Sequence, residues 1–462
     1  MHDIAALLDD LTGIPYSTNL SQVRAKSRDM TLSFSPILKQ DLQGKSAEVV
    51  VTPRSQAEVI QVVAACARHR IPLLPRGAGT GNFGQAIPLS GGVILDMTAL
   101  KQVLWVKGRR IRAQAGAILE SLDQAAKAAG GELRIHPSTL RTATVGGFVG
   151  GGHAGIGAVT YGILRDPGNI LGLSVLSVEE EPQIHEIRGR QVNWVHHAYG
   201  TNGIILEVEL PLAPAQEWLE VILCFENFMD GARCAVALGQ ADGIAKKVIS
   251  LCEWPVPSYF KPLSAYIPPH RTTVLTLVAA ENEEALRWLA EDHRGQITYC
   301  KAAGLGEFGP LYEYTWGHTG LYAIKAGISL SYALGLFPPH DLIGSIERVW
   351  RRFQSLGPLC LEMKRMDGRG VMAQGSPVFN FVSNEHMIQV IREMEAEGVH
   401  VRNSHTYLIE ASGFKTVEPE EQAFKQRMDP YNLLNPGKLS IASPKDPAGK
   451  AGLDLEVTGW KA

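Results

Sequence analysis

A loop with four glycines follows a short apolar run in the first quarter of the chain. Residues 75–84 read PRGAGTGNFG and come directly after IPLL at 71–74. Successive backbone N–H groups in such a loop can curl around a phosphate, because glycine reaches the positive φ angles that this curl requires. A tight surface loop without a ligand has a similar composition. The loop alone is therefore compatible with a phosphate site and with a plain turn.

The elements around the loop argue against a Rossmann nucleotide site. Ser55 and Glu58 form a capping-box pattern at the start of a predicted helix. A strand at 71–74, the loop and a second strand at 93–97 follow. A Rossmann loop opens a helix whose N-terminus holds the pyrophosphate. Here the loop leads into QAIPLSGG at 85–92, where a proline and two glycines do not permit a helix.

Two further glycine-rich segments indicate a ligand with several parts. HPSTLRTATVGGFVGGGHAGIGAVTYG spans 136–162 and is predicted to form neither ordinary helix nor strand, because each interior glycine costs about 1 kcal/mol relative to alanine. Such a backbone suits close approach to an extended ligand. Gly200 and Gly203 then precede an alternating strand in GTNGIILEVEL. Three separate glycine-rich contacts predict one long cofactor.

Length and composition narrow the class of protein. The chain has 462 residues, which predicts two or three domains, and a net charge of -3 without a stripe of Lys and Arg, so no nucleic-acid partner is expected. No apolar stretch is long enough to cross a bilayer. The acidic start reads as a short helix rather than a secretory signal. Six scattered cysteines without CxxC spacing favour a reduced, cytoplasmic protein.

Six motifs occur in the order found in the FAD-linked oxidase family: TPRSQAEV, PRGAGTG, TVGGFVGGG, YGILRDPGNILGLSVL, GTNGIILEVEL and DPYNLLNPGKL. The chain thus resembles the vanillyl-alcohol oxidase and p-cresol methylhydroxylase superfamily, in its glycolate and D-2-hydroxyacid dehydrogenase branch. The resemblance implies an α+β fold, with a two-subdomain FAD-binding domain of the p-cresol methylhydroxylase type and an α+β cap domain. The expected parts are an N-terminal helical segment (1–44), the FAD-binding domain (45–214), the cap (215–424), a C-terminal segment returning to the FAD domain (425–440) and a tail (441–462).

The resemblance also implies which residues contact FAD. The loop would cradle the pyrophosphate, the second segment would run beside the flavin and ribityl chain, and the third would present backbone to the cofactor. Relatives with covalent flavin often carry the attached histidine in the loop, where this chain has Thr80. Non-covalent FAD is therefore expected, with His153 as another imidazole near the flavin path. The implied residues are Arg76, Gly77, Ala78, Gly79, Thr80, Gly81, Asn82, Pro137, Ser138, Thr144, Gly146, Gly147, Gly203, Ile204 and Ile205.

The metal motifs of the 2-hydroxyacid dehydrogenases are missing. Their HxGDGNxH-like run corresponds best to AQGSPVFNFVSNEH at 373–386, which lacks the paired histidines. Their EHGxG-like run corresponds to IEASG, with Glu410 but Ala411 in place of histidine. A single Glu is not a metal site, and His196 with His197 is a weak candidate without a third ligand. No metal is expected.

Polar residues of the cap are the candidates for chemistry. EYTWGHTGLYAIKAG at 313–327 contains His318, which could take a hydroxyl proton, and Lys325, which could pair with a carboxylate. Trp316 and Tyr322 in the same run are equally compatible with a core. In HVRNSHTYLIE at 400–410, His405 and Tyr407 share one face of a predicted strand, which could be pocket or core. Arg365 reads as a solvated charge.

The closing motif DPYNLLNPGKL is expected to return to the FAD domain, with Asn435 and Lys438 near the flavin. A cation there would stabilise the negative charge of reduced flavin. His318, Lys325, Tyr407 and Lys438 are therefore the candidate catalytic residues.

The sequence predicts an FAD-dependent oxidoreductase that oxidises a small polar alcohol or 2-hydroxy acid by hydride transfer to flavin N5. Its partners are a small-molecule substrate and an electron acceptor that the sequence does not identify, and a homodimer is possible. One alternative is an accessory or electron-transfer subunit of a glycolate-oxidase-like complex, without substrate chemistry of its own. Another is a binding module for a different nucleotide.

Overall fold

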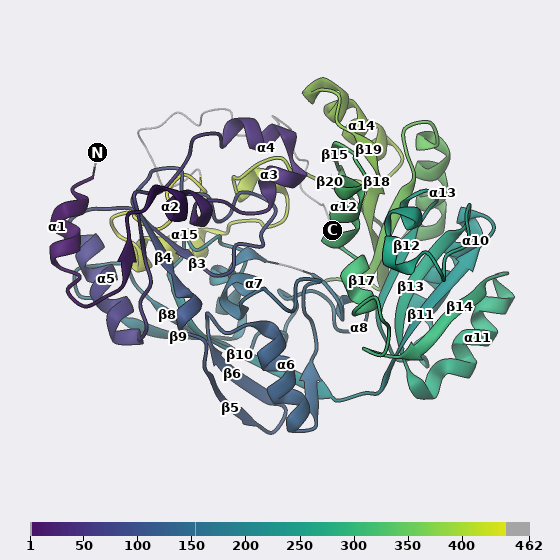
Figure 1. The fold of residues 1–462 in the computed structure, drawn as a ribbon, viewed down its shortest axis with the longest axis horizontal. Helices are drawn as coiled ribbons and strands as arrows, with labels where there is room; N and C mark the ends of the chain where they lie inside the picture. The colour runs from purple at the N-terminus through teal and green to yellow at the C-terminus, as the bar shows by residue number, and fades with distance from the viewer. Residues whose placement is uncertain (1, 153, 440–462) are drawn as a thin grey trace.

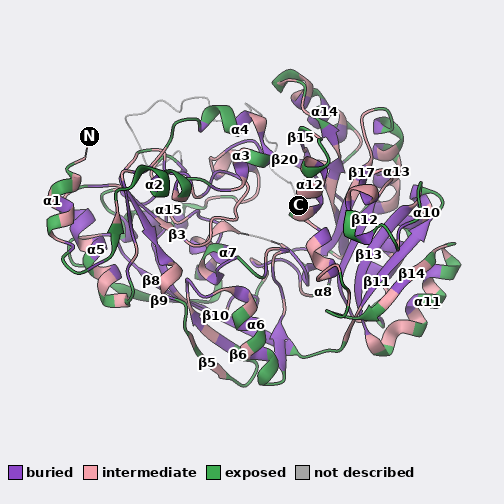
Figure 2. Ribbon diagram, in the orientation of Figure 1, coloured by how far each residue is buried: buried purple, intermediate pink, exposed green. Residues whose placement is uncertain are grey.

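The computed structural model describes residues 2–152 and 154–439, and it places two lobes side by side (Figure 1). One lobe holds a four-stranded and a six-stranded sheet, and the other holds an eight-stranded sheet with helices over one face. Buried residues concentrate in the strands, whereas the exposed residues lie on the outer faces of the helices (Figure 2). His153 and the predicted tail at 441–462 lie outside the described residues.

The four-stranded sheet carries the glycine loop. Its strand order is β1 (Tyr16–Ser17), β2 (Val49–Val51), β4 (Val93–Asp96) and β3 (Leu73–Arg76), with β2, β4 and β3 mutually parallel. Helix α5 (Gln56–Arg68) connects β2 to β3, and the predicted cap is present, since Ser55 Oγ accepts the Glu58 N–H. The loop leaves β3 and enters β4 without an intervening helix, as the proline and glycines of 85–92 predict.

The six-stranded sheet forms the rest of the first lobe and is antiparallel where its strands pair. Its longest strand, β10, follows the third glycine-rich segment and pairs with β6, β7 and β8. The strands are β5 (Val103–Lys107), β6 (Arg110–Gln114), β7 (Gly131–Leu133), β8 (Gly172–Leu176), β9 (Ile184–Arg188) and β10 (Ile204–Pro214), with helices α6 (Leu119–Ala128), α7 (Val145–Gly151) and α9 (Val192–Val195). The short helix α8 (Ala158–Tyr161) packs against the second lobe instead.

The N-terminal segment adds short helices to this lobe: α1 (Ile4–Asp9), α2 (Leu20–Lys26), α3 (Thr31–Phe34) and α4 (Pro36–Asp41). Helix α15 (Pro419–Met428) brings the end of the described chain back to it, where the Leu73 N–H donates to Leu433 O at 2.9 Å and the Asn435 N–H donates to Leu73 O at 2.9 Å. The base of the glycine loop is therefore held by a segment more than 350 residues away in sequence.

The second lobe is built on one antiparallel sheet. In order across the sheet its strands are β14 (Gln296–Ala302), β11 (Trp218–Phe225), β13 (Thr272–Ala279), β12 (Lys246–Cys252), β17 (Leu359–Arg365), β18 (Val371–Pro377), β16 (Leu334–Phe337) and β20 (His400–Arg402). A smaller sheet pairs β15 (Leu330–Ser331) with β19 (Phe379–Asn380). The main helices are α10 (Phe228–Gln240), α11 (Glu283–Asp292), α12 (Gly317–Lys325), α13 (Leu342–Phe353) and α14 (Asn384–Ala396).

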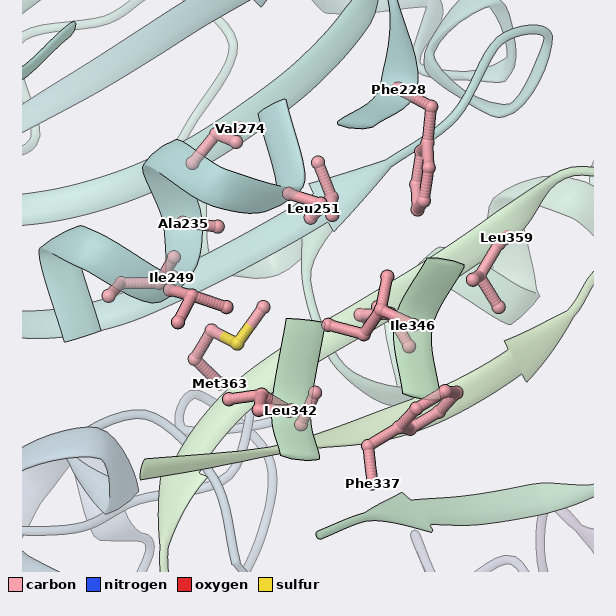
Figure 3. Packing of buried hydrophobic residues seen from close by; sticks show 14 of the residues in the cluster. Phe228, Ala235, Ile249, Leu251, Val274, Phe337, Leu342, Ile346, Leu359 and Met363 are labelled. Atoms are coloured by element: carbon pink, nitrogen blue, oxygen red, sulfur yellow. The ribbon is translucent and has the colours of Figure 1, made fainter. Parts of the chain in front are cut away.

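A hydrophobic core joins one face of this sheet to its helices. Phe228 from α10, Ile346 from α13 and Met363 from β17 meet in it (Figure 3). Because strand side chains alternate between faces, burying Leu361 and Met363 in this core turns Glu362 and Lys364 to the opposite face of β17. That opposite face borders the candidate site.

Candidate active site

One cavity of about 720 Å³ collects residues from both lobes. It is bordered by the glycine loop, by segments at 137–155 and 190–205, by the start of α12 and by the cap strands β17 and β18. Most of the residues expected to contact FAD line it, and so does His318. The expected residues on its wall are Arg76, Gly77, Ala78, Gly79, Thr80, Gly81, Asn82, Pro137, Ser138, Thr144, Gly146, Gly147, Gly203, Ile205 and His318.

Two glycine positions of the loop, Gly77 and Gly79, have no room for a side chain. Gly79 has φ +73°, and a Cβ on it would lie 2.0 Å from Nη2 of Arg76. A Cβ on Gly77 would lie 2.0 Å from Oγ1 of Thr144, at the start of α7. Glycine at these two positions therefore lets the loop backbone approach both the Arg76 guanidinium and α7. A backbone of this kind can present N–H groups to an anionic ligand.

Arg76 supplies a buried positive charge beside the loop. Its Nη1 donates a 2.8 Å hydrogen bond to Arg28 O, while its Nε is buried without a hydrogen-bond partner. Burial lowers the pKa of this guanidinium, and the carboxylates of Asp29 and Asp96 act in the opposite direction. A phosphate group would accept a hydrogen bond from Arg76 Nε and balance the guanidinium charge, so the residues at this wall fit a pyrophosphate.

The prediction that the second glycine-rich segment forms no helix is wrong. Residues 145–151 are the α-helix α7, capped by Thr144 Oγ1, which accepts the Gly147 N–H at 3.3 Å. A Cβ on Gly146 would lie 2.6 Å from the Cβ of Ala115, and a Cβ on Gly152 would lie 2.0 Å from the His197 ring. No larger side chain therefore fits at Gly146 within α7 or at its C-cap Gly152.

Asn435 and Lys438 were expected near the flavin, and they lie behind the glycine loop without lining the cavity themselves. Asn435 Nδ2 donates to Gln85 O at 2.9 Å and to Tyr199 O at 2.8 Å, and Lys438 Nζ donates to Gly84 O at 2.8 Å. Burial lowers the pKa of Lys438 to about 7, and the charge of Asp29 acts in the opposite direction. These side chains fix the backbone around the loop. Ile204 is also buried away from the cavity, although Gly203 and Ile205 border it.

Lys325 and the predicted strand at 400–410 are two further corrections. Lys325 is exposed at the end of α12, with Nζ 5.1 Å from the centre of the Tyr322 ring, and it does not line the cavity. Only His400–Arg402 is a strand. His405 is fully buried between Ser35 Oγ at 2.8 Å and Tyr332 O at 3.1 Å, and Tyr407 packs near Lys438. Neither His405 nor Tyr407 borders the cavity.

The start of α12 presents Trp316 and His318 to the cavity. Trp316 has φ +55°, a left-handed conformation that is unusual for a bulky residue. The backbone N–H of Trp316 donates to Glu362 Oε1 on β17 at 2.5 Å, and Ser250 Oγ donates to the same oxygen at 2.8 Å. Burial lowers the pKa of the His318 imidazole, with Glu313 opposing that shift. This shift favours the neutral imidazole, whose unprotonated ring nitrogen can accept a proton.

Sequence reasoning missed the polar face of β17 and β18. Glu362, Lys364 and Gln374 line the cavity from these strands, and Arg402 lines it from β20. Burial raises the pKa of Glu362 to about 8 and lowers the pKa of Lys364 far below its ordinary value. The signal in the sequence was the alternation CLEMK at 360–364, in which charged residues take every second position of a strand otherwise buried in a core.

The donor set matches FAD better than it matches a metal ion. In the described part of the chain, no group of three or more His, Cys, Asp or Glu side chains is placed to hold a metal. Among these same residues, no helix is both long and apolar enough to cross a membrane. The glycine cradle, the unsatisfied Arg76 Nε and a wall contributed by both lobes fit a dinucleotide.

Comparisons with known proteins agree with this geometry. Residues 47–181 match the family described as FAD binding domain. The chain is 27% identical over 211 residues to the glycolate oxidase subunit GlcD of Bacillus subtilis, covering 44% of each chain, and 32% identical over 196 residues to a D-lactate dehydrogenase of Anaerostipes hadrus, covering 40% of each. It thus aligns with less than half the length of these relatives. A solved alkyldihydroxyacetonephosphate synthase matches 93% of this chain and 84% of its own with a TM-score of 0.67 at 14% identity, which is a likeness of fold.

Residues 47–181 form an FAD binding domain, and the chain has the α+β FAD-binding fold of the p-cresol methylhydroxylase type. FAD is its cofactor.

Proposed function

We propose that the protein is an FAD-dependent oxidoreductase that oxidises the CH–OH group of a small polar alcohol or 2-hydroxy acid. The observation that carries this proposal is that the FAD-binding wall and the neutral imidazole of His318 border the same cavity. A proton acceptor beside a flavin is what the oxidation of an alcohol requires, because the hydroxyl proton and the hydride leave from adjacent atoms.

FAD, when bound, would supply the two-electron redox chemistry of the oxidation. His318 takes the hydroxyl proton on its ring nitrogen. The first turn of α12, which carries His318, is held to the cap sheet by the hydrogen bond from the Trp316 backbone N–H to Glu362. The Gly77–Gly81 backbone and Arg76 would hold the pyrophosphate, and the cofactor would be bound non-covalently, since Thr80 in the loop offers no imidazole for a covalent link.

Anaerobic reduction of the purified holoprotein tests the proposal. The flavin absorbance is followed while 2-hydroxy acids and neutral alcohols are added one at a time, and at least one hydroxy compound should bleach it. Photoreduction of the same sample shows that the flavin can be reduced. A flavin that is photoreducible but indifferent to the whole series would contradict the proposal and favour an electron-transfer subunit.

A further inference from the structure

Two cysteine thiols lie directly opposite each other on neighbouring strands of the cap sheet. Cys252 on β12 pairs with Cys360 on β17 in an antiparallel register without a shift. Side chains at directly opposite positions of a ladder lie on the same face of the sheet. Cys252 belongs to a hydrophobic cluster against which Cys360 packs. All six cysteines lie in the described residues, and these two alone stand opposite each other in a strand pairing.

The hydrogen-bond pattern places the two α-carbons as close as an antiparallel ladder allows. The next pair along the ladder is Glu253 and Leu359, and the Glu253 N–H donates to Leu359 O at 3.0 Å. Opposite pairs alternate between hydrogen-bonded and non-hydrogen-bonded, so Cys252 and Cys360 form a non-hydrogen-bonded pair. The α-carbons of such a pair lie about 4.5 Å apart, within the range of about 4.4–6.8 Å that a disulfide spans. The backbone separation therefore already suits a disulfide.

One of the two thiols is reached from the FAD cavity and the other is not. Cys360 is half-buried and lines the cavity. Cys252 is 1% exposed and does not line it. A reagent that enters the cavity therefore meets Cys360 first, with Cys252 behind it as a second thiol. This is the arrangement of an attacking cysteine next to a resolving cysteine.

The surroundings make the pair slow to react and its disulfide hard to reduce. Burial raises the pKa of the Cys360 thiol, and a hydrogen-bonding contact with the Cys252 thiol raises it further. Because the thiolate is the nucleophile, the raised pKa slows attack on a small disulfide. Strongly oxidising pairs owe their ease of reduction to a stabilised reduced form, which a raised thiol pKa does not provide. The disulfide is therefore expected to form slowly and to persist once formed.

We propose that Cys252 and Cys360 form a reversible disulfide at the cap wall of the FAD cavity, with a small-molecule disulfide as the oxidant. The Cys360 thiolate attacks one sulfur of the oxidant, which forms a mixed disulfide and releases one small thiol. Cys252 then attacks Sγ of Cys360 and releases the second small thiol. Two electrons pass from the pair to the oxidant, and the two cysteine protons leave with the released thiols.

The disulfide would lie next to the contact that holds the start of α12. Ser250 and Glu362 are the next pair on the same face of β12 and β17, and Ser250 Oγ donates to Glu362 Oε1 at 2.8 Å. The same oxygen accepts the Trp316 backbone N–H at the turn that carries His318. Oxidation would therefore add a covalent link between the two strands that anchor this turn. The pair is thus a redox-sensitive modification site of the cap, beyond the proposed oxidation of an alcohol and independent of it.

Titration of the holoprotein with dithiodipyridine tests the site, because each thiol that attacks this reagent releases a coloured thiopyridone. A lone thiol releases one thiopyridone and keeps the pyridylthio adduct. The Cys252–Cys360 pair should release two and keep no adduct. The reaction is followed to its end point, since the raised pKa of Cys360 makes it slow. Peptide mapping without reductant should then find the peptides of Cys252 and Cys360 cross-linked, and dithiothreitol should separate them.

The variants separate the roles of the two thiols. Cys252→Ser should release one thiopyridone fewer than the parent and keep the adduct on Cys360. Cys360→Ser should release neither of the two, because Cys252 does not border the cavity. Cys300→Ser is the matched control, since Cys300 is also half-buried but stands opposite Val221, and this variant should still form the cross-link.

The map of the parent protein decides the proposal even where a variant fails to fold. A parent in which Cys360 keeps the adduct while Cys252 stays a free thiol would overturn it, and so would a parent in which Cys360 does not react. The titration contains no hydroxy compound, so either result would leave the proposed oxidoreductase function standing.

Discussion

The Lys438 ammonium donates a 2.8 Å hydrogen bond to the carbonyl oxygen of Gly84, at the end of the glycine loop. Lys438 has 0% of its side chain exposed, so this contact is formed away from water. The C-terminal segment therefore braces the FAD-binding loop from behind instead of contributing to the cavity wall.

Replacing Lys438 with Met should loosen the loop. Gly84 O would lose its donor and the buried Asp29 would lose a compensating charge, which should lower the free energy of unfolding by about 1–3 kcal/mol. FAD affinity should fall with it. Urea unfolding and fluorescence titration of the apoprotein with FAD measure the two effects, and Lys325→Met at an exposed position is the control. An FAD Kd equal to that of the parent would contradict a bracing role.

Replacing Gly79 with Val should abolish FAD binding. The position has φ +73°, and the new Cβ would collide with the Arg76 guanidinium at 2.0 Å. Gly304→Val is a suitable control, since that glycine has φ +83° but no atom within 4 Å of a Cβ. The flavin content of both purified variants is read from their absorbance spectra. A Gly79→Val protein that retains stoichiometric FAD would show that this loop is not the pyrophosphate cradle.

Replacing His318 with Asn should preserve FAD and slow flavin reduction by about 10²-fold, the usual scale of general base catalysis. Because burial lowers the pKa of His318 below 6.5, the parent rate should be level above pH 6.5 and fall as the imidazole becomes protonated in more acidic solution. Stopped-flow reduction between pH 5 and pH 8 measures this profile. The variant should lack the acidic decline, whereas the exposed His340→Asn control should keep it. A variant with the parent profile would exclude His318 as the base.

Glu362 should make stability depend on pH. Its pKa rises from an ordinary 4.5 to about 8 on folding, so the folded state holds a proton that the unfolded state releases between those values. The stabilisation is complete below pH 4.5 and is lost as the pH rises through about 8, with a slope of at most about 1.4 kcal/mol per pH unit. Urea unfolding of Glu362→Gln should show a flatter dependence from pH 5 to pH 8. Parallel curves for variant and parent would show that the carboxyl is not protonated in the fold.

Local sequence signals predicted the scaffold of the FAD site well. The Ser55 cap, the α5 periodicity and the absence of a helix after the glycine loop depend on neighbouring residues, and each appears as expected. The loop residues from Arg76 to Asn82 also border the cavity as expected. Their glycine content is a local signal too, because it determines which φ angles the backbone can adopt.

Long-range packing decided the features that local patterns missed. Gly146 of α7 packs so closely against Ala115 that no larger side chain fits there, which no local propensity can show. Lys325 lies in the same short run as His318, yet it is exposed at the far end of α12 and does not border the cavity. Lys364 and Gln374 meet only through the β17–β18 pairing, so their hydrogen bond could not be inferred from their positions in the sequence.

The visible absorption spectrum of the purified protein, recorded before and after acid precipitation, tests the central claim most directly. A two-band flavin spectrum that moves into the supernatant on precipitation is the predicted result, and it would establish a non-covalently bound flavin. Colour retained in the pellet would contradict the non-covalent attachment. A colourless protein that also fails to bind added FAD would contradict the account of the cavity as a whole.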